Sequence, residues 1–208
     1  MEVYVEVVNK IKKNADAYNN LLGIEYYFCL GYKGKGFEVR VHFSKEEFHH
    51  LEGIGQLRDL KIHSESGNRT FDMALAGDVL EDELKKSHFY QSGCVQNKVD
   101  YLYLLERIFD EDNIVFRFRK SMKGSGKIEA ELFLTSELEN GQFFVYLDRV
   151  EESDEEYYCR SFVANPEFDR TQGHVKLTTL WKEKINLETG ERTVLYRYKD
   201  FSPDQLNM

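Results

Sequence analysis

The sequence has few cysteines. Its three, Cys29, Cys94 and Cys159, lie far apart among 208 residues and form no C-x-x-C pair. An odd number of widely spaced cysteines disfavours both a disulfide scaffold and a structural zinc site. Unpaired thiols are typical of proteins that stay in a reducing compartment. We therefore expect free, reduced cysteines.

Long hydrophobic runs are also missing. No apolar stretch approaches the roughly 20 residues that a helix needs to cross a bilayer. The first residues, MEVYVEVVNKIKKN, carry Glu2 and Glu6 among their apolar side chains, unlike the apolar centre of a signal peptide. We expect a soluble, intracellular protein with no membrane partner.

The chain has no basic excess. Asp and Glu number 37 against 28 Lys and Arg, which gives a formal net charge of −9. Generic nucleic-acid binders usually carry the opposite balance. A nuclease is not excluded, because a local basic cleft can act inside an acidic protein. The hydrophobic fraction of 41% is sufficient for a substantial core, and we expect residues 1–208 to form a single domain.

The order of predicted elements favours an α+β fold. Helical patterns dominate the first half, at residues 3–22, 44–51, 70–86 (with a possible interruption at Gly77) and 99–109. A β-hairpin lies among them, because IEYYFCLGY and FEVRVHF are rich in β-branched and aromatic residues and flank the turn KGKG. Six strand-like runs follow between residues 114 and 199. The sequence thus predicts N-terminal helices and a hairpin followed by a mostly antiparallel sheet.

One predicted helix contains two adjacent histidines. In FSKEEFHHLEG, Ser44 and Glu47 match a capping box and predict a helix over residues 44–51. The side chains expected on its buried side are Phe43, Phe48 and Leu51, with Glu46 and His49 outward. His50 lies next to the break at Glu52-Gly53.

The two histidines do not suit a metal site. Neighbouring residues point about 100° apart on a helix, so His49 and His50 cannot easily hold one ion. The sequence has no H-E-x-x-H motif and no cysteines at zinc spacing. A histidine that is partly exposed at a helix end suits a general acid or base, because imidazole titrates near neutral pH. A purely structural histidine is the alternative.

Two glycine-rich segments are not nucleotide-binding loops. In GSGK (Gly124–Lys127), the first glycine of a phosphate loop would fall on Ser121, and Ile128 stands where Ser or Thr is required. GYKGKG lies between two predicted strands, whereas a dinucleotide fingerprint joins a strand to a helix. Both segments are interpreted as strand connections.

Basic residues gather in FRFRKSMKGSGK. If one strand contains both Arg117 and Arg119, they share a face and could bind phosphates together. A charged outer face of the sheet is the alternative. A second basic group, Arg40, Lys61 and His63, flanks the histidine helix.

The histidine helix and the later strands resemble a known family. The pattern F-x-x-x-x-F-x-H-L-x-G-[IL]-x-x-L-x-D is matched by Phe43, Phe48, His50, Leu51, Gly53, Ile54, Leu57 and Asp59. GKIEAELFLTS, FFVYLDR, YYCRSF and a loop that ends at Gln172 follow in the family's order. Residues 20–185 resemble the phage-associated nuclease-like domains named for barnase, EndoU, colicin and RelE, in their fourth phage-borne type.

The resemblance implies a compact α+β domain of the BECR fold. It also implies a metal-independent ribonuclease, encoded by a phage or prophage, that acts as a toxin or host-directed effector in the cytoplasm of a bacterial cell. In such chemistry a base deprotonates the ribose 2′-OH, which attacks the adjacent phosphate, while a cation stabilises the added charge and an acid protonates the leaving oxygen. RNA would be the partner, and no cofactor would be needed.

Site residues follow from the same resemblance. His50 would be the base or acid, and Lys61 or Arg40 would stabilise the phosphate. The candidate catalytic residues are His50, Lys61 and Ser161, and the candidate substrate-binding residues are Arg40, Lys127, Tyr158 and Gln172. Only His50 occupies a matching motif position. Gln56 stands where the family often has a basic residue.

Two other functions stay open. The acidic composition favours a catalytically inactive phage or mobile-element protein that binds a protein partner or inhibitor. A small-molecule binder with a cavity in the sheet is the third reading. RNA cleavage, a stable protein partner or a bound ligand would distinguish the three.

Overall fold

The computed structural model describes residues 9–90, 94–120, 128–139 and 141–207. The helices are α1 (Lys10–Asn19), α2 (Lys45–Leu51), α3 (Gly67–Ala76), α4 (Glu81–Leu84), α5 (Cys94–Tyr101) and α6 (Leu105–Asp110), with 3₁₀ helices η1 (Ile54–Gln56), η2 (Lys61–Ser64), η3 (Leu102–Leu104) and η4 (Pro203–Asn207). The strands are β1 (Ile24–Tyr32), β2 (Lys35–His42), β3 (Ile114–Arg117), β4 (Leu132–Leu138), β5 (Gly141–Arg149), β6 (Glu156–Ala164), β7 (Val175–Lys176), β8 (Thr178–Asn186) and β9 (Arg192–Arg197). The predicted α+β class is confirmed.

The described strands form one mixed sheet in the order β7-β3-β4-β5-β6-β2-β1-β8-β9. The predicted hairpin is confirmed, with Tyr32 opposite Lys35 at its turn. All neighbouring strands run antiparallel except β2 and β6, which pair in parallel and place His42 opposite Tyr158. The N-terminal hairpin therefore lies inside the sheet rather than ahead of it.

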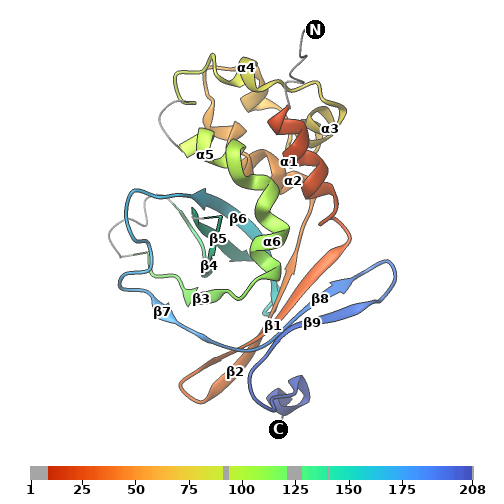
Figure 1. Ribbon diagram of the computed structural model, residues 1–208, viewed down its shortest axis with the longest axis vertical. Coiled ribbons are helices and arrows are strands. Elements are labelled where there is room, and N and C mark those ends of the chain that lie inside the picture. The colour runs from red at the N-terminus through yellow and green to blue at the C-terminus, as the bar shows by residue number, and fades with distance from the viewer. Residues whose placement is uncertain (1–8, 91–93, 121–127, 140, 208) are drawn as a thin grey trace, which may run out of the picture.

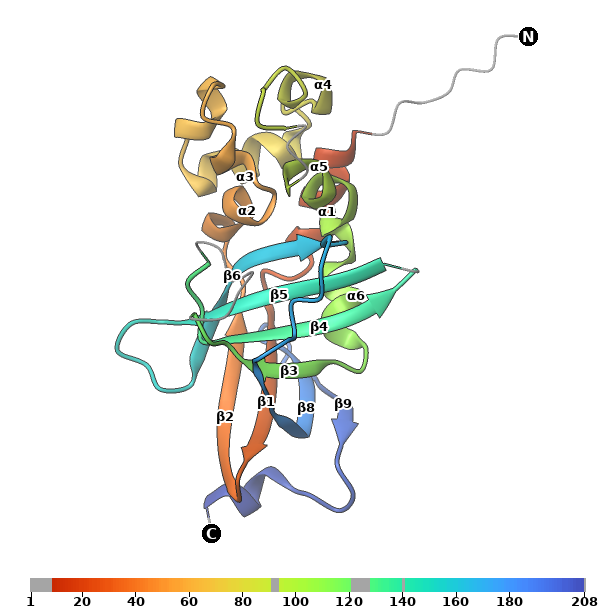
Figure 2. The same ribbon diagram turned by 90° about the vertical axis from the view of Figure 1, so that its left-hand side faces the viewer.

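Helices α1 to α5 gather at one end of the molecule, and α6 runs from them along the sheet (Figure 1). The main core lies between these helices and one face of the strands. Phe48 and Leu51 of α2 are fully buried in it, together with Cys159 of β6. Figure 2 shows α2 above the start of β6.

Smaller clusters fill the opposite face of the sheet. One contains Phe116, Phe118, Phe133, Phe144 and Tyr146. Successive side chains of a strand point to opposite faces, so along β3, β4 and β5 these aromatic residues alternate with residues of the main core. This face therefore also excludes water over the central strands.

Several boundaries differ from the sequence prediction. Strand β3 ends at Arg117, so Arg119 does not share a strand face with it. The helix predicted over residues 99–109 is instead α5, η3 and α6 in succession. The predicted break at Gly77 is confirmed, because this residue ends α3 in the left-handed region with φ of 86°. Residues 1–8 and Gly124–Lys127 lie outside the described residues.

Within the described ranges, none of the helices has both the length and the apolar character needed to cross a bilayer. The same residues contain no group of three or more His, Cys, Asp or Glu side chains that could hold a metal ion. Cys29 and Cys159 are buried free thiols.

Candidate active site

A cavity of about 580 Å³ opens beside α2. We call it the His50 pocket. Its walls come from the end of β2, from α2, from the turn between β5 and β6, and from β6 itself. The polar side chains of the lining include His42, Glu46, Glu47, His50, Arg149, Tyr158 and Arg160.

The start of α2 is fixed by its cap. The Ser44 backbone N–H donates to Glu47 Oε2 at 2.7 Å, and Ser44 Oγ accepts from the Glu46 N–H at 3.3 Å. This is the predicted capping box, and it is confirmed. Glu47 is thereby committed to the helix terminus although it lines the pocket. The helix ends at Glu52 and Gly53, whose φ of 84° favours glycine.

His50 lies on the last turn of α2. The residue is exposed, yet desolvation of its ring, together with the charges of Lys98 and Arg160, lowers its pKa to about 4. The imidazole is therefore neutral at neutral pH and able to accept a proton. The cations that depress its pKa also favour an anion beside it.

His49 points elsewhere. It was expected to face outward, but its Nδ1 lies 2.8 Å from Thr70 Oγ1 of α3, and the side chain is half-buried. The reason is that α3 packs directly against α2. The sequence of α2 alone cannot predict this contact. His49 is a packing residue, and desolvation lowers its pKa.

Buried polar groups hold the C-terminal end of α2. Lys98 Nζ of α5 donates to the backbone carbonyl of His50 at 3.1 Å. Glu52 is fully buried, and its two carboxylate oxygens accept from Asn14 Nδ2 of α1 at 2.9 and 3.0 Å. The same Asn14 nitrogen donates to the Val99 carbonyl at 2.8 Å. The Asn14 side chain therefore connects α1 to α5 and to Glu52, which follows the end of α2 and lies two positions after His50.

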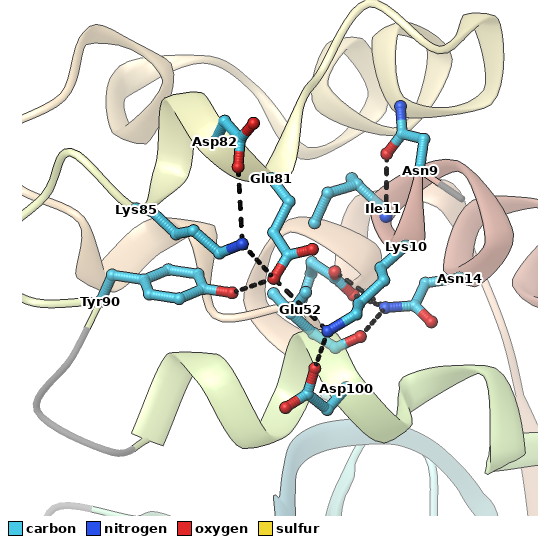
Figure 3. Close-up of polar contacts among 11 residues, drawn as sticks. Asn9, Lys10, Ile11, Asn14, Glu52, Glu81, Asp82, Lys85, Tyr90 and Asp100 are labelled. Atoms are coloured by element: carbon cyan, nitrogen blue, oxygen red, sulfur yellow. Dashed lines mark hydrogen bonds and ion pairs between the residues drawn. The ribbon is translucent and has the colours of Figure 1, made fainter. Parts of the chain in front are cut away.

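Burial raises the pKa of Glu52 to about 8, although the Asn14 amide and Lys98 act in the opposite direction. The carboxyl is therefore largely protonated at neutral pH. An outer ring of ion pairs surrounds it in Figure 3, where Lys10 lies 2.6 Å from Asp100 and Glu81 accepts from the Tyr90 hydroxyl at 3.1 Å. These contacts fix the C-terminal end of α2, which carries His50.

The sheet supplies the other functional groups. His42, the last residue of β2, lies opposite Tyr158 in the parallel pairing with β6. Arg160 is two residues farther along β6, and its guanidinium lies 3.5 Å from the Tyr158 hydroxyl. Among the described residues, no carboxylate lies within ion-pair distance of Arg160. Its charge is thus available to a ligand.

His42 has a carboxylate partner. Its Nε2 lies 3.4 Å from Glu25 Oε2 of β1, and Glu25 is itself buried. A carboxylate that contacts one ring nitrogen fixes the orientation of the imidazole. Glu25 is held in turn by Arg40 at 2.9 Å.

Arg40 belongs to this supporting group rather than to the pocket wall. Besides Glu25, its guanidinium approaches Glu38 at 3.5 Å and Glu155 at 3.8 Å, and it lies over the Tyr27 ring at 4.6 Å. Three carboxylates leave little free charge for a phosphate.

The other sequence-predicted residues lie in different places. Lys61 is exposed on η2 and is not part of the pocket lining. Ser161 is buried opposite Tyr146 of β5, on the far side of a bulge in β6. Gln172 is exposed in the loop after β6, close to Asp169. Lys127 lies outside the described residues. Of the seven, the pocket brings together His50 and Tyr158.

Sequence reasoning missed His42, Arg149 and Arg160. The sequence could have predicted that Tyr158 and Arg160 lie on the same face of a strand, because residues two apart in a strand share a face. Nothing local revealed that β2 would lie parallel to β6 and carry His42 to them.

The family described as phage-Barnase-EndoU-ColicinE5/D-RelE like nuclease 4 matches residues 10–199. The chain belongs to this family. The match extends the resemblance seen over residues 20–185 toward both ends, and it includes α2 with His50 and β6 with Tyr158. No curated protein and no solved structure matches the chain. For this member of the nuclease-like family, the assignment of roles therefore rests on its own geometry.

Proposed function

We propose that this phage-type nuclease-like protein is a metal-independent ribonuclease that acts by general acid–base chemistry in the His50 pocket. The observation that carries the proposal is the pocket itself, where a neutral imidazole, a second histidine and an arginine meet, and where this arginine has no carboxylate partner among the residues that the structure describes. We further propose that it acts on RNA in the cytoplasm of a bacterial host, as a toxin or effector encoded by a phage or prophage.

In the proposed reaction, His50 takes the proton of a ribose 2′-OH. The 2′ oxygen then forms a bond to the adjacent phosphorus, and the bond from phosphorus to the 5′ oxygen breaks. Arg160 stabilises the charge that develops on the phosphoryl oxygens. His42, oriented by Glu25, donates a proton to the departing 5′ oxygen. The products are a 2′,3′-cyclic phosphate and a 5′-hydroxyl.

Cleavage of labelled RNA in EDTA tests this proposal. We expect the wild-type protein to cleave and His50→Ala to lose about 100-fold or more of the rate, as is usual when a general acid or base is removed. His88→Ala is the matched control, because His88 is exposed and does not line the pocket. Thermal unfolding and circular dichroism verify that each variant is folded. Equal activity of His50→Ala and wild type would sink the proposal.

Binding of a protein partner without catalysis is the second candidate function. Glu46 and Glu151 are exposed at the rim of the pocket, and most of the turn at residues 151–156 is exposed and acidic. Such a rim suits a basic partner surface. A folded wild-type protein that cleaves no RNA but retains one partner on a column, released by Glu46→Lys, would favour this function.

A further inference from the structure

We propose that a second pocket, beside the β1–β2 hairpin, binds a nucleotide of single-stranded RNA next to the phosphate held at His50. This inference rests on the proposed function and extends it from the reacting phosphate to the neighbouring part of the strand. The pocket has a volume of about 650 Å³. We call it the hairpin pocket, and its relevant side chains are Tyr32, Lys35, Phe37, Arg117, Phe118 and Arg149.

The two pockets are neighbours. Arg149 and Tyr157 line both of them, so the side chains at the end of β5 and the start of β6 are their common wall. A strand with its reacting phosphate near His50 can therefore continue past Arg149 into the hairpin pocket.

The cations of the hairpin pocket differ in how they are paired. Arg149 is neutralised by Glu131 at 2.7 Å and by Asp154 at 3.2 Å. Arg117 and Lys35 are exposed, and no ion pair to either is formed within the described part of the chain. The five charged side chains of the lining, these three cations with Glu131 and Asp154, therefore carry a net charge of +1. In a protein of net charge −9, the two cations outside ion pairs make this pocket a local site for phosphate groups.

Aromatic rings lie beside these charges. The Arg117 guanidinium lies 5.7 Å from the ring centroids of both Tyr32 and Phe37, which are only half-buried. Phe118 forms a buried part of the lining. Aromatic rings and guanidinium planes are the surfaces on which unpaired bases stack. Bases in a duplex are already stacked and paired, so this combination selects a single strand.

The decisive experiment measures binding separately from cleavage. The probe is a fluorescein-labelled single-stranded RNA whose 2′ positions are methylated, because it lacks the attacking hydroxyl and cannot be cleaved by the proposed route. Anisotropy gives Kd as a function of salt for wild type, Arg117→Ala and Phe37→Leu. Arg58→Ala is the charge-matched control, since Arg58 is exposed and lines neither pocket.

We expect Arg117→Ala to weaken binding about 10-fold and to reduce the salt slope of log K by about 0.7, the value for one contact to a single-stranded phosphate. Phe37→Leu should weaken binding about 5-fold or more through lost stacking. Arg58→Ala should bind within about twofold of wild type. Arg117→Ala and Phe37→Leu should also lose cleavage of a long oligomer while a dinucleotide, which reaches only the His50 pocket, is cleaved as by wild type, and Arg58→Ala should cleave both as wild type does.

Other results would overturn the inference. These are an absence of binding by wild type, equal effects of Arg117→Ala and Arg58→Ala, or equal affinity for duplex and single strand with no effect of Phe37→Leu. Loss of dinucleotide cleavage in Arg117→Ala would also contradict it, by placing Arg117 in the chemical step. If binding depends on Arg117 but no RNA is cleaved, the hairpin pocket stands and the proposed ribonuclease activity fails.

Discussion

At the scale of single residues, the environment of a side chain decides its chemistry. His49 and His50 are adjacent and of the same residue type, but His49 contacts Thr70 of α3 whereas His50 lines the His50 pocket. The sequence predicted the position of His50 near a helix end. It could not show that the folded protein would desolvate this ring and place the charges of Lys98 and Arg160 near it, which together keep it neutral. These charged residues belong to a helix and a strand that are far from His50 in the sequence.

Glu52 gives a prediction at this scale. Its pKa is about 8 in the folded protein, against an ordinary value of 4.5. Between these values the folded protein keeps a proton that the unfolded chain has lost, so the free energy of unfolding falls as pH rises from about 5 to about 8. The slope approaches at most about 1.4 kcal/mol per pH unit. Glu52→Gln removes this titration, and it should gain stability relative to wild type across that window.

Urea denaturation at several pH values between 5 and 9 measures the effect. Glu46→Gln is the control, because Glu46 is exposed and the change should give a nearly constant difference from wild type. A constant difference for Glu52→Gln as well would mean that the buried carboxyl titrates as an ordinary one.

At the scale of elements, short-range signals were sufficient for the position of α2 and of the hairpin. The capping box and the glycine turn act within a few residues of each other, so the sequence alone identifies them. The prediction was less accurate for α5 to α6, where a 3₁₀ segment replaces continuous helix. Tertiary packing sets such boundaries.

Removing the cap of α2 should have a measurable cost. Ser44→Ala loses the hydroxyl that accepts from the Glu46 N–H, and we expect about 1 kcal/mol lower stability. Ser44→Asp keeps an acceptor at the helix N-terminus and should retain most of the wild-type stability. Chemical denaturation compares the three proteins. A loss of the same size in Ser44→Asp would point to another role for the serine.

At the scale of the whole molecule, the site depends on the joining of distant segments. His42 and Tyr158 are 116 positions apart in the chain and meet only through the parallel pairing of β2 with β6. The network of Asn14, Glu52 and Lys98 then fixes the helices over this junction. Because one sheet runs from β7 to β9, we keep the prediction that residues 1–208 fold as a single domain.

Unfolding curves test that prediction. Trp181 is the sole tryptophan and lies on β8, whereas ellipticity at 222 nm reports mainly on the helices at the other end. We expect both probes to give the same urea midpoint, because a cooperative domain unfolds in one transition. Separate midpoints would show that the helical end and the β8–β9 end unfold independently. Repeating the measurement with Ser44→Ala should move both midpoints together.

Short stretches of the chain are enough to predict its class of fold, the hairpin, the capped histidine helix and the motif that resembles the family. Each depends on periodicity or on hydrogen bonds between residues a few positions apart. The neighbours of His50, the proton held by Glu52 and the contact of Arg117 with Tyr32 and Phe37 follow from the folded arrangement. Those outcomes depend on strand pairing and desolvation across the whole chain, and no short window of sequence contains them.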